Sequence, residues 1–320
     1  MFRTRSLSAA LWTAVSIAAP IRAAGIADQE VAFLTKRDGN FEIYLKCRDG
    51  RELNLTNHPG HDFGMTWSPD GSKLAFATRR DGNEEIYELE VASGALRNLT
   101  ANPATDTQPS WSPDGRSVAF FSDRGAEGPD AHQRRDLHVL TIATGEVRRL
   151  TRNSLYQESA SWTPEGRELV FCRMRAAADA SEPAICDLWA IEVASGAERR
   201  LTDRPGFNSA PTASLAGSPI LFHGRDGDRR ELLALDPASG TVTNLTDDGR
   251  EDWQPAWSHD GTEIVWCAGE RPHEYDIWVM KSDGSGRRPL VEHPGREEWP
   301  LPRPVAAGGG PCAATAPAAD

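Results

Sequence analysis

Six polar side chains recur at one position of this 320-residue chain, five residues before a tryptophan or its equivalent. All six are carboxylates or amides: Asp62, Asp106, Gln157, Asn208, Asp252 and Glu298. Carboxylates held close together repel one another, raise some of their pKa values and attract cations. Such a group could hold a calcium ion through oxygen ligands or receive basic side chains of a partner. Alternatively, these side chains cap loops by accepting hydrogen bonds from backbone amides.

Histidines and tryptophans supply two further candidate sites. His58, His61 and His293 lie in two loops that each contain a Pro-Gly pair, and three imidazoles brought together could bind zinc or manganese. The Pro-Gly pairs are also typical of simple turns. Trp253 and Trp299 directly follow the recurring polar position. On a rim they could anchor a partner or stack on a sugar, and between sheets they would be core residues.

A sequence repeat must position these residues. Tryptophans that precede a turn recur at Trp67, Trp111, Trp162 and Trp257, with Ala213 and Arg303 at the equivalent positions of two other copies. A Leu-Thr pair keeps the same spacing of about 44 to 51 residues, beginning at Leu55, Leu99, Leu150, Leu201 and Leu245, with a degraded copy at Leu290-Val291. Repeats of this length with four short strand signals predict the blades of a β-propeller.

The two ends of the repeat region complement each other. Residues Val31–Thr35, Phe41–Cys47 and Arg51–Thr56 have the character of second, third and fourth strands, and Glu297–Arg303 has that of a first strand without followers. Pairing them removes exposed sheet edges. We therefore predict an all-β fold over residues 25–303, a six-bladed propeller of four-stranded blades closed by the C-terminal strand. The six polar residues would then surround one mouth of the central channel.

These motifs resemble TolB-type propeller repeats. The resemblance lies in Trp-Ser-Pro-Asp-Gly at 67–71 and 111–115, and in Arg-Asp-Gly-Asn followed by Glu-Ile-Tyr at 37–44 and 80–87. It covers roughly residues 30–303 and implies a periplasmic propeller that serves as a protein-binding platform, as TolB does with the lipoprotein Pal. TolB has an α/β domain before its propeller, and few residues precede the first blade here. Oligogalacturonate lyases, related at repeat level, use rim histidines with a metal.

The N-terminal residues predict export. Residues 1–24 have two early arginines, an apolar stretch and small residues near a cleavage point, as signal peptides do. Export permits disulfides, and Cys172 and Cys186 flank an insertion between two strands that could bring them together. We expect Cys47 and Cys267 to be buried single thiols. Residues 304–320, which include Cys312, are rich in Ala, Gly and Pro and predict a disordered tail.

The net charge and the absence of known catalytic motifs limit the classes of function that the sequence favours. A net charge of −12 argues against nucleic-acid binding. The chain has no Gly-x-Ser-x-Gly, His-Glu-x-x-His or phosphate-binding glycine motif, so no catalytic residue is predicted. We expect long loops at Asp123–Arg135 and Arg173–Ile185 to lie on the face that bears the six polar residues.

The sequence favours an exported, non-catalytic protein-interaction module of the cell envelope. We expect it to be monomeric, without stable membrane insertion after signal cleavage, and without a cofactor unless calcium occupies the channel. Two alternatives stay open. One is a metal-dependent polysaccharide lyase or hydrolase that uses the rim histidines. The other is a glycan or small-ligand binder that uses Trp253 and Trp299.

Overall fold

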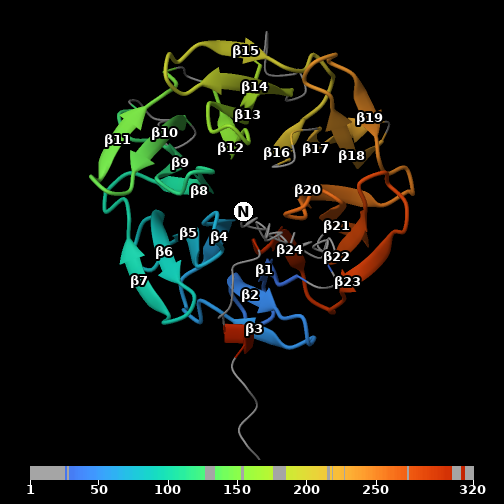
Figure 1. The fold of residues 1–320 in the computed structure, drawn as a ribbon, viewed down its shortest axis with the longest axis horizontal. Helices are drawn as coiled ribbons and strands as arrows, with labels where there is room; N and C mark the ends of the chain where they lie inside the picture. The colour runs from blue at the N-terminus through green and yellow to red at the C-terminus, as the bar shows by residue number, and fades with distance from the viewer. Residues whose placement is uncertain are drawn as a thin grey trace, which may run out of the picture.

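The strands of the chain form a ring of six blades around a central channel (Figure 1). The computed structural model describes residues 26, 29–126, 134–152, 155–175, 185–214, 217, 219–226, 228–271, 274–304 and 311–313. Within these residues the strands form six four-stranded antiparallel sheets, which confirms the predicted fold class. No helix in the described ranges is long and apolar enough to cross a membrane. The predicted signal peptide, residues 1–24, lies outside them.

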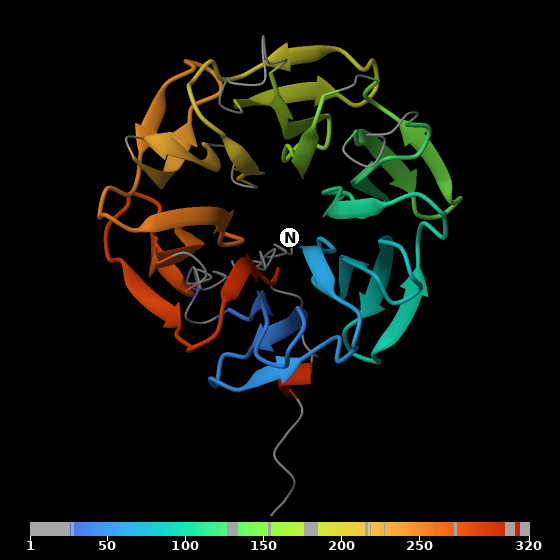
Figure 2. The same ribbon diagram turned by 180° about the vertical axis from the view of Figure 1, so that it is seen from behind.

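Each blade runs from an innermost strand at the channel to an outermost strand at the rim (Figure 2). Blade one contains β24 (Glu297–Pro302), β1 (Val31–Thr35), β2 (Glu42–Lys46) and β3 (Glu52–Asn54). Blade two contains β4 (Asp62–Trp67), β5 (Lys73–Thr78), β6 (Glu85–Glu90) and β7 (Ala95–Asn98). Blade three contains β8 (Asp106–Trp111), β9 (Ser117–Ser122), β10 (Asp136–Thr141) and β11 (Glu146–Arg149).

The second half of the ring repeats this order. Blade four contains β12 (Gln157–Trp162), β13 (Glu168–Met174), β14 (Cys186–Glu192) and β15 (Glu198–Arg200). Blade five contains β16 (Ser209–Ala213), β17 (Ile220–Asp226), β18 (Arg229–Leu235) and β19 (Val242–Asn244). Blade six contains β20 (Glu251–Trp257), β21 (Glu263–Arg271), β22 (Glu274–Lys281) and β23 (Arg288–Val291).

The two ends of the propeller close the ring as predicted. Strand β24 pairs antiparallel with β1, with Val31 opposite Pro302 and Thr35 opposite Glu297. Beyond β24, the backbone N–H of Arg303 donates to the carbonyl of Glu30 at 2.7 Å, and its Nε donates to the carbonyl of Gly71 in blade two at 2.7 Å. The C-terminal strand is therefore fixed to both the first and the second blade.

Aromatic and aliphatic side chains fill the space between blades. Phe76, Phe120, Phe171, Phe222 and Trp266 occupy equivalent places on the second strands and are fully buried. The tryptophans that precede the turns are 6 to 9% exposed, which confirms them as core residues: Trp67, Trp111, Trp162 and Trp257. Burial of each large apolar side chain contributes about 1.5–3 kcal/mol to stability.

The Asp of each Pro-Asp-Gly turn has a structural role. In blade two, Oδ1 of Asp70 accepts hydrogen bonds from the hydroxyl of Ser68 at 2.6 Å and from the backbone N–H of Ser72 at 3.0 Å. Gly71 follows with φ +67, a conformation that side chains disfavour. These bonds lower the pKa of Asp70. The turn thus uses the carboxylate to satisfy local donors.

Two disulfides are present, one expected and one not. Cys172 and Cys186 form the expected bond within blade four. The expectation of a single thiol at Cys47 was wrong, because Cys47 is bonded to Cys312 across 265 residues of sequence. Cys312 lies in a short 3-10 turn, Pro311–Ala313, within the segment expected to be disordered. Cys267 is free and buried, as predicted.

Candidate binding site at the channel mouth

A ring of left-handed residues forms the narrow part of the channel. Every innermost strand has a register shift against its neighbour, as between Phe63 and Met65 in blade two. At each shift one residue takes a positive φ between 46 and 56: Gly64, Gln108, Ser159, Ala210, Gln254 and Trp299. All six line a central cavity of about 140 Å³. None of the described residues that line this cavity is a carboxylate.

The prediction that Glu298 occupies the recurring polar position was wrong by one residue. Trp299 matches Gln254 in its backbone conformation, so Glu297 and not Glu298 matches Asp252. Glu297 also has the expected partners, because Thr35 donates to its Oε1 at 2.9 Å and Arg37 lies 3.1 Å from its Oε2. Glu298 instead forms an ion pair with Arg296.

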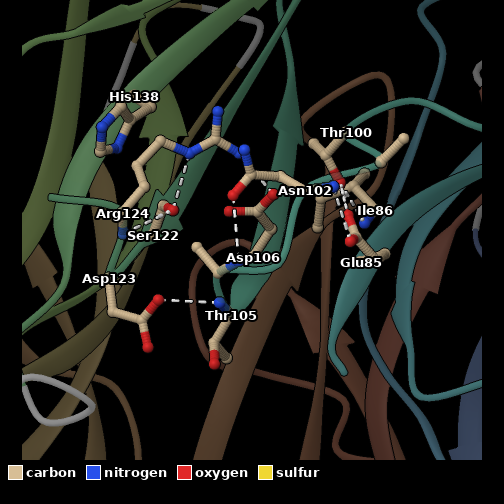
Figure 3. A network of polar contacts seen from close by, with 12 residues as sticks. Glu85, Ile86, Thr100, Asn102, Thr105, Asp106, Ser122, Asp123, Arg124 and His138 are labelled. Carbon is tan, nitrogen blue, oxygen red and sulfur yellow. Dashed lines mark hydrogen bonds and ion pairs between the residues drawn. The ribbon is translucent and has the colours of Figure 1, made fainter. Parts of the chain in front are cut away.

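The recurring acidic side chains are buried inside the blades. Asp106 has no exposed surface, and its Oδ2 accepts a hydrogen bond from Nη2 of Arg124 at 2.5 Å (Figure 3). Nε of Arg124 also donates to the hydroxyl of Ser122 at 2.9 Å, and its guanidinium lies 5.0 Å from the ring centre of Phe120. Burial raises the pKa of Asp106 to about 6, and Ser122 and Arg124 oppose this rise.

We call this buried pair of a carboxylate and an arginine a clasp. Equivalent clasps occur in blades two and one. In blade two, Arg80 lies 3.7 Å from the buried Asp62 and stacks on Phe76 and Tyr87. In blade one, Arg37 and Glu297 form the corresponding pair. Burial raises the pKa of both Asp62 and Glu297. A carboxylate so placed holds the second strand of its own blade through an arginine.

The remaining three positions use other partners. Gln157 accepts a hydrogen bond from Nη2 of Arg173 at 3.3 Å, and Nδ2 of Asn208 donates to the carbonyl of Cys186 at 2.9 Å. Asp252 accepts from Nε1 of Trp266 at 2.7 Å. Burial raises the pKa of Asp252 to about 7, and the charges of Asp248 and Glu231 add to this rise. The predicted polar ring thus lies behind the channel wall, and its role in binding a partner stays a prediction.

The three histidines do not form a metal cluster in the structure. Nδ1 of His58 accepts from the backbone N–H of Gly60 at 3.0 Å, and Nδ1 of His293 accepts from that of Gly295 at 2.9 Å. Nδ1 of His61 accepts from the backbone N–H of Phe41 at 3.3 Å. Each imidazole therefore holds a local turn or strand. Across the described ranges, no group of three or more His, Cys, Asp or Glu side chains is arranged to hold a metal ion.

The two rim tryptophans lie in a hollow at the channel mouth. The hollow has a volume of about 530 Å³ and is formed by blades three to six together with β24. Its lining residues are Gln108, Glu158, Ser159, Phe207, Ser209, Ala210, His223, Arg225, Arg230, Trp253, Gln254 and Trp299. Five members of the left-handed ring line both this hollow and the channel: Gln108, Ser159, Ala210, Gln254 and Trp299. We call it the mouth hollow.

The mouth hollow lies at the ends of the second and third strands of blade five, where blades three and four have their long insertions. Arg225 and Arg230 belong to the β17–β18 hairpin, which joins the second and third strands of blade five. The insertions at Asp123–Arg135 and Arg173–Ile185 join the same two strands in blades three and four. Residues 127–133 and 176–184 of these insertions lie outside the described ranges. The shared connection places the hollow and the described ends of these insertions on one face.

Several polar groups in the mouth hollow are already engaged. Glu158 accepts hydrogen bonds from the hydroxyl of Ser209 at 2.5 Å and from that of Tyr156 at 2.6 Å. Nδ1 of His223 accepts from the backbone N–H of Gln254 at 3.3 Å. Burial, with help from Arg230, lowers the pKa of His223 to about 3, so the imidazole is neutral at physiological pH. The hollow therefore holds no free general base at these two positions.

The family follows from a sequence match that spans nearly the whole ring. Residues 23–180 and 130–301 match the TolB beta propeller domain. The chain belongs to this TolB beta-propeller family. Over 152 residues it is 26% identical to an uncharacterized protein of Agrobacterium fabrum, a match that covers 46% of this chain and 50% of that protein. The chain thus matches only half the length of this curated relative.

Solved structures share the fold of this TolB-family chain. TolB from Acinetobacter baumannii superposes with a TM-score of 0.73 at 22% identity, covering 88% of this chain and 68% of that one. An oligogalacturonate lyase in complex with manganese superposes with a TM-score of 0.55 at 14% identity, covering 82% of this chain and 73% of that one. At these identities the likeness concerns the fold alone.

Sequence reasoning found Trp253 and Trp299 but missed the polar lining of the mouth hollow. Phe207 and Arg230 lie outside the recurring motifs, whereas Arg225 belongs to an Arg-Asp-Gly sequence at 225–227 that also occurs at 37–39 and 80–82. One signal was available in the sequence. Blade five has Asn208 where blades one, two, three and six have an acid, so Arg225 of its Arg-Asp-Gly sequence has no carboxylate at that position.

Proposed function

We propose that this TolB-family protein is an exported, non-catalytic binding protein of the cell envelope, which holds a segment of a partner protein at the mouth hollow. The observation that carries the proposal is the hollow itself, a concave site of about 530 Å³. Phe207, Trp253 and Trp299 give it half-buried aromatic surface on a closed ring of sheets. Buried aromatic anchors in concave sites dominate the energy of protein interfaces.

The state of the polar groups supports binding over catalysis. A general base must reach a substrate proton with an available lone pair near the working pH. Glu158 is engaged by two hydroxyl donors, and Nδ1 of His223 is engaged by a backbone N–H. The signal-like residues 1–24 and the TolB-family membership support export to the envelope. We further propose that the protein is a monomer, which sedimentation velocity would test.

Affinity capture tests the proposal directly. The purified protein is immobilised, incubated with an envelope fraction, and the bound proteins are identified and titrated. Trp253→Ala should weaken capture of a specific protein at least tenfold, which corresponds to about 1.4 kcal/mol. Trp278→Ala is the matched control, because Trp278 lies on β22 and does not line the hollow. Equal capture by the Trp253 variant and the control would contradict the proposal.

A glycan remains a second candidate occupant, because Trp253 and Trp299 both line the mouth hollow. Titration with cell-wall fragments while following tryptophan fluorescence separates the two candidates. Saturable quenching that Trp253→Ala abolishes, together with no captured protein, would favour the glycan. We find no specific observation that favours a metal-dependent lyase, since each rim histidine holds a local backbone group.

A further inference from the structure

Two arginines face each other at the edge of the mouth hollow. Arg225 on β17 and Arg230 on β18 are direct cross-strand partners in the hairpin of blade five, and both line the hollow. Like charges directly opposite each other in an antiparallel pair are unfavourable. The arrangement therefore lowers the stability of the hairpin unless another group compensates for the two positive charges.

The structure provides little compensation. Nη1 of Arg225 donates to the carbonyl of Asp228 at 3.1 Å, and Arg225 forms no ion pair with any described residue. The nearest carboxylate to Arg230 is that of Glu251, at 3.9 Å, and the Arg230 side chain is 41% exposed. Arg124 and Arg175, by comparison, have carboxylate oxygens at 2.5 and 2.6 Å. The chain has a net charge of −12, yet these two arginines of one hollow have no carboxylate as close as those of Arg124 and Arg175.

Among the described lining residues, one carboxylate offsets part of this charge. Glu158, the one carboxylate among the described lining residues, is occupied by the hydroxyls of Ser209 and Tyr156. His223 contacts Trp253 edge to face and adds no negative charge. Arg296, just outside the lining, lies 5.8 Å from the Trp253 ring centre and is paired with Glu298. With two arginines and one carboxylate, the described lining carries a net positive charge.

The surroundings of Trp253 favour a peptide over a sugar. Arg230 and Arg296 lie 5.6 and 5.8 Å from its ring centre, and Tyr275 lies at 5.0 Å. A sugar stacks on a bare aromatic face, and these three side chains occupy part of the space around the half-buried Trp253 ring. The guanidiniums of Arg225 and Arg230 offer a ligand planar donors, which suit carboxylates.

We infer that the mouth hollow contains a carboxylate-binding subsite, in which Arg225 and Arg230 together receive an acidic side chain of an extended peptide segment. This inference rests on the proposed protein-binding function and specifies its partner as acidic at the point of contact. The aromatic side chains of Phe207 and Trp299, which line the hollow, would contact the apolar neighbours of that acidic residue.

Defined peptides test the subsite. The probe is a fluorescein-labelled ten-residue peptide of alternating serine and glutamate, and its partner has glutamine in place of glutamate. Both have amidated C-termini, so that side-chain charge is the one difference between them. Fluorescence anisotropy measures both with the wild-type protein, with the double variant Arg225→Gln/Arg230→Gln, and with Arg229→Gln. Arg229 is the control because it lies in the same hairpin but does not line the hollow.

The expected result is a preference of at least tenfold for the glutamate peptide in the wild-type protein and in the Arg229 variant. The double variant should lose this preference and have an equal or higher melting temperature, since neither arginine has a close ion pair to lose and the repulsion between them is removed. Equal binding of the two peptides, no binding of the glutamate peptide at 1 mM, or a preserved preference in the double variant would each overturn the inference. Tighter binding of an oligogalacturonate through the same arginines would also overturn it.

Envelope capture separates this inference from the proposed function. If Trp253→Ala abolishes capture and the double arginine variant does not, the protein-binding function stands and the carboxylate subsite is wrong. If neither variant changes capture, both proposals fall. If both variants reduce it, the acidic contact and the binding site are supported together.

Discussion

The backbone N–H of Trp299 donates a hydrogen bond to Oε1 of Gln254, 3.0 Å away in the neighbouring blade. The same relationship recurs on the other side of the channel, where the N–H of Ser159 donates to Oε1 of Gln108 at 2.9 Å. All four residues have left-handed backbones in the ring that narrows the channel. The ring is thus closed by side-chain contacts between blades as well as by the pairing of β24 with β1.

Removal of this glutamine acceptor should destabilise the closed ring. In Gln254→Met the N–H of Trp299 loses its partner, and an unsatisfied buried donor costs about 1–3 kcal/mol. We expect chemical denaturation to show a loss of that size, and a similar loss for Gln108→Met. A change of only a few tenths of a kcal/mol in both variants would show that water replaces the glutamines.

Reduction of the Cys47–Cys312 disulfide should lower the melting temperature. The bond joins the outer strands of blade one to the C-terminal segment across 265 residues of sequence, so it restricts a very large loop in the unfolded chain. On the loop-entropy account it contributes about 5.5 kcal/mol. Differential scanning calorimetry of Cys312→Ser should show this loss.

The double variant Cys172→Ser/Cys186→Ser is the control for that measurement. Its bond closes a loop of only 14 residues and should contribute less on the same account. An equal or larger effect from the short loop would show that unfolded-chain entropy does not decide the contribution of Cys47–Cys312.

Removal of the carboxylate in a clasp should cost more than removal of the whole clasp. Asp106→Ala leaves Arg124 and its buried surroundings without the charge 2.5 Å away, and breaking a buried pair costs about 3–5 kcal/mol. Asp106→Ala/Arg124→Met removes both charges and should recover part of that loss. Urea denaturation of the single and double variants measures the difference. Equal stabilities would mean that the pair contributes by packing alone.

Asp252 should make the protein less stable as the pH rises. Its folded pKa of about 7 lies above the unfolded value of about 3.9, so the folded state binds more protons between these two pH values. Stability from the neutral carboxyl is therefore present below about pH 4 and is lost as pH rises through 7, by up to about 4 kcal/mol. Asp252→Asn keeps an oxygen acceptor for Trp266 and should flatten this dependence.

Unfolding free energies measured from pH 4 to 8 test that prediction. The Asn variant should be more stable than the wild-type protein at pH 8 and nearly equal to it at pH 4. Asp70→Asn provides a contrast, since hydrogen bonds from Ser68 and Ser72 lower the pKa of Asp70. Parallel pH profiles for Asp252→Asn and the wild-type protein would contradict the assignment of Asp252 as a destabilising charge.

Local chemistry in the sequence was enough to predict the blades and their closure. Leu-Thr pairs, Pro-Asp-Gly turns and short apolar runs each act over a few residues, and their periodic return fixed six blades. The complementary strands at Val31 and Glu297 predicted β24 beside β1, because an open ring would expose sheet edges. The tryptophans before the turns recur once in each of four blades, and they were correctly predicted to lie in the core.

Contacts between distant segments decided the rest. The last repeat lacks the tryptophan that marks the position in other repeats, and counting back from Arg303 gave Glu298. The strand pairing places Pro302 opposite Val31, so Pro302 is the equivalent residue and Glu297 is the recurring acid. The Cys47–Cys312 bond depends on where the chain passes after closure, and the pairing of Arg225 with Arg230 depends on a hairpin register. Repetition of a short motif specifies each blade, because its interactions are local. The mouth hollow arises only where side chains of several blades meet, and their relative positions exist only in the assembled ring.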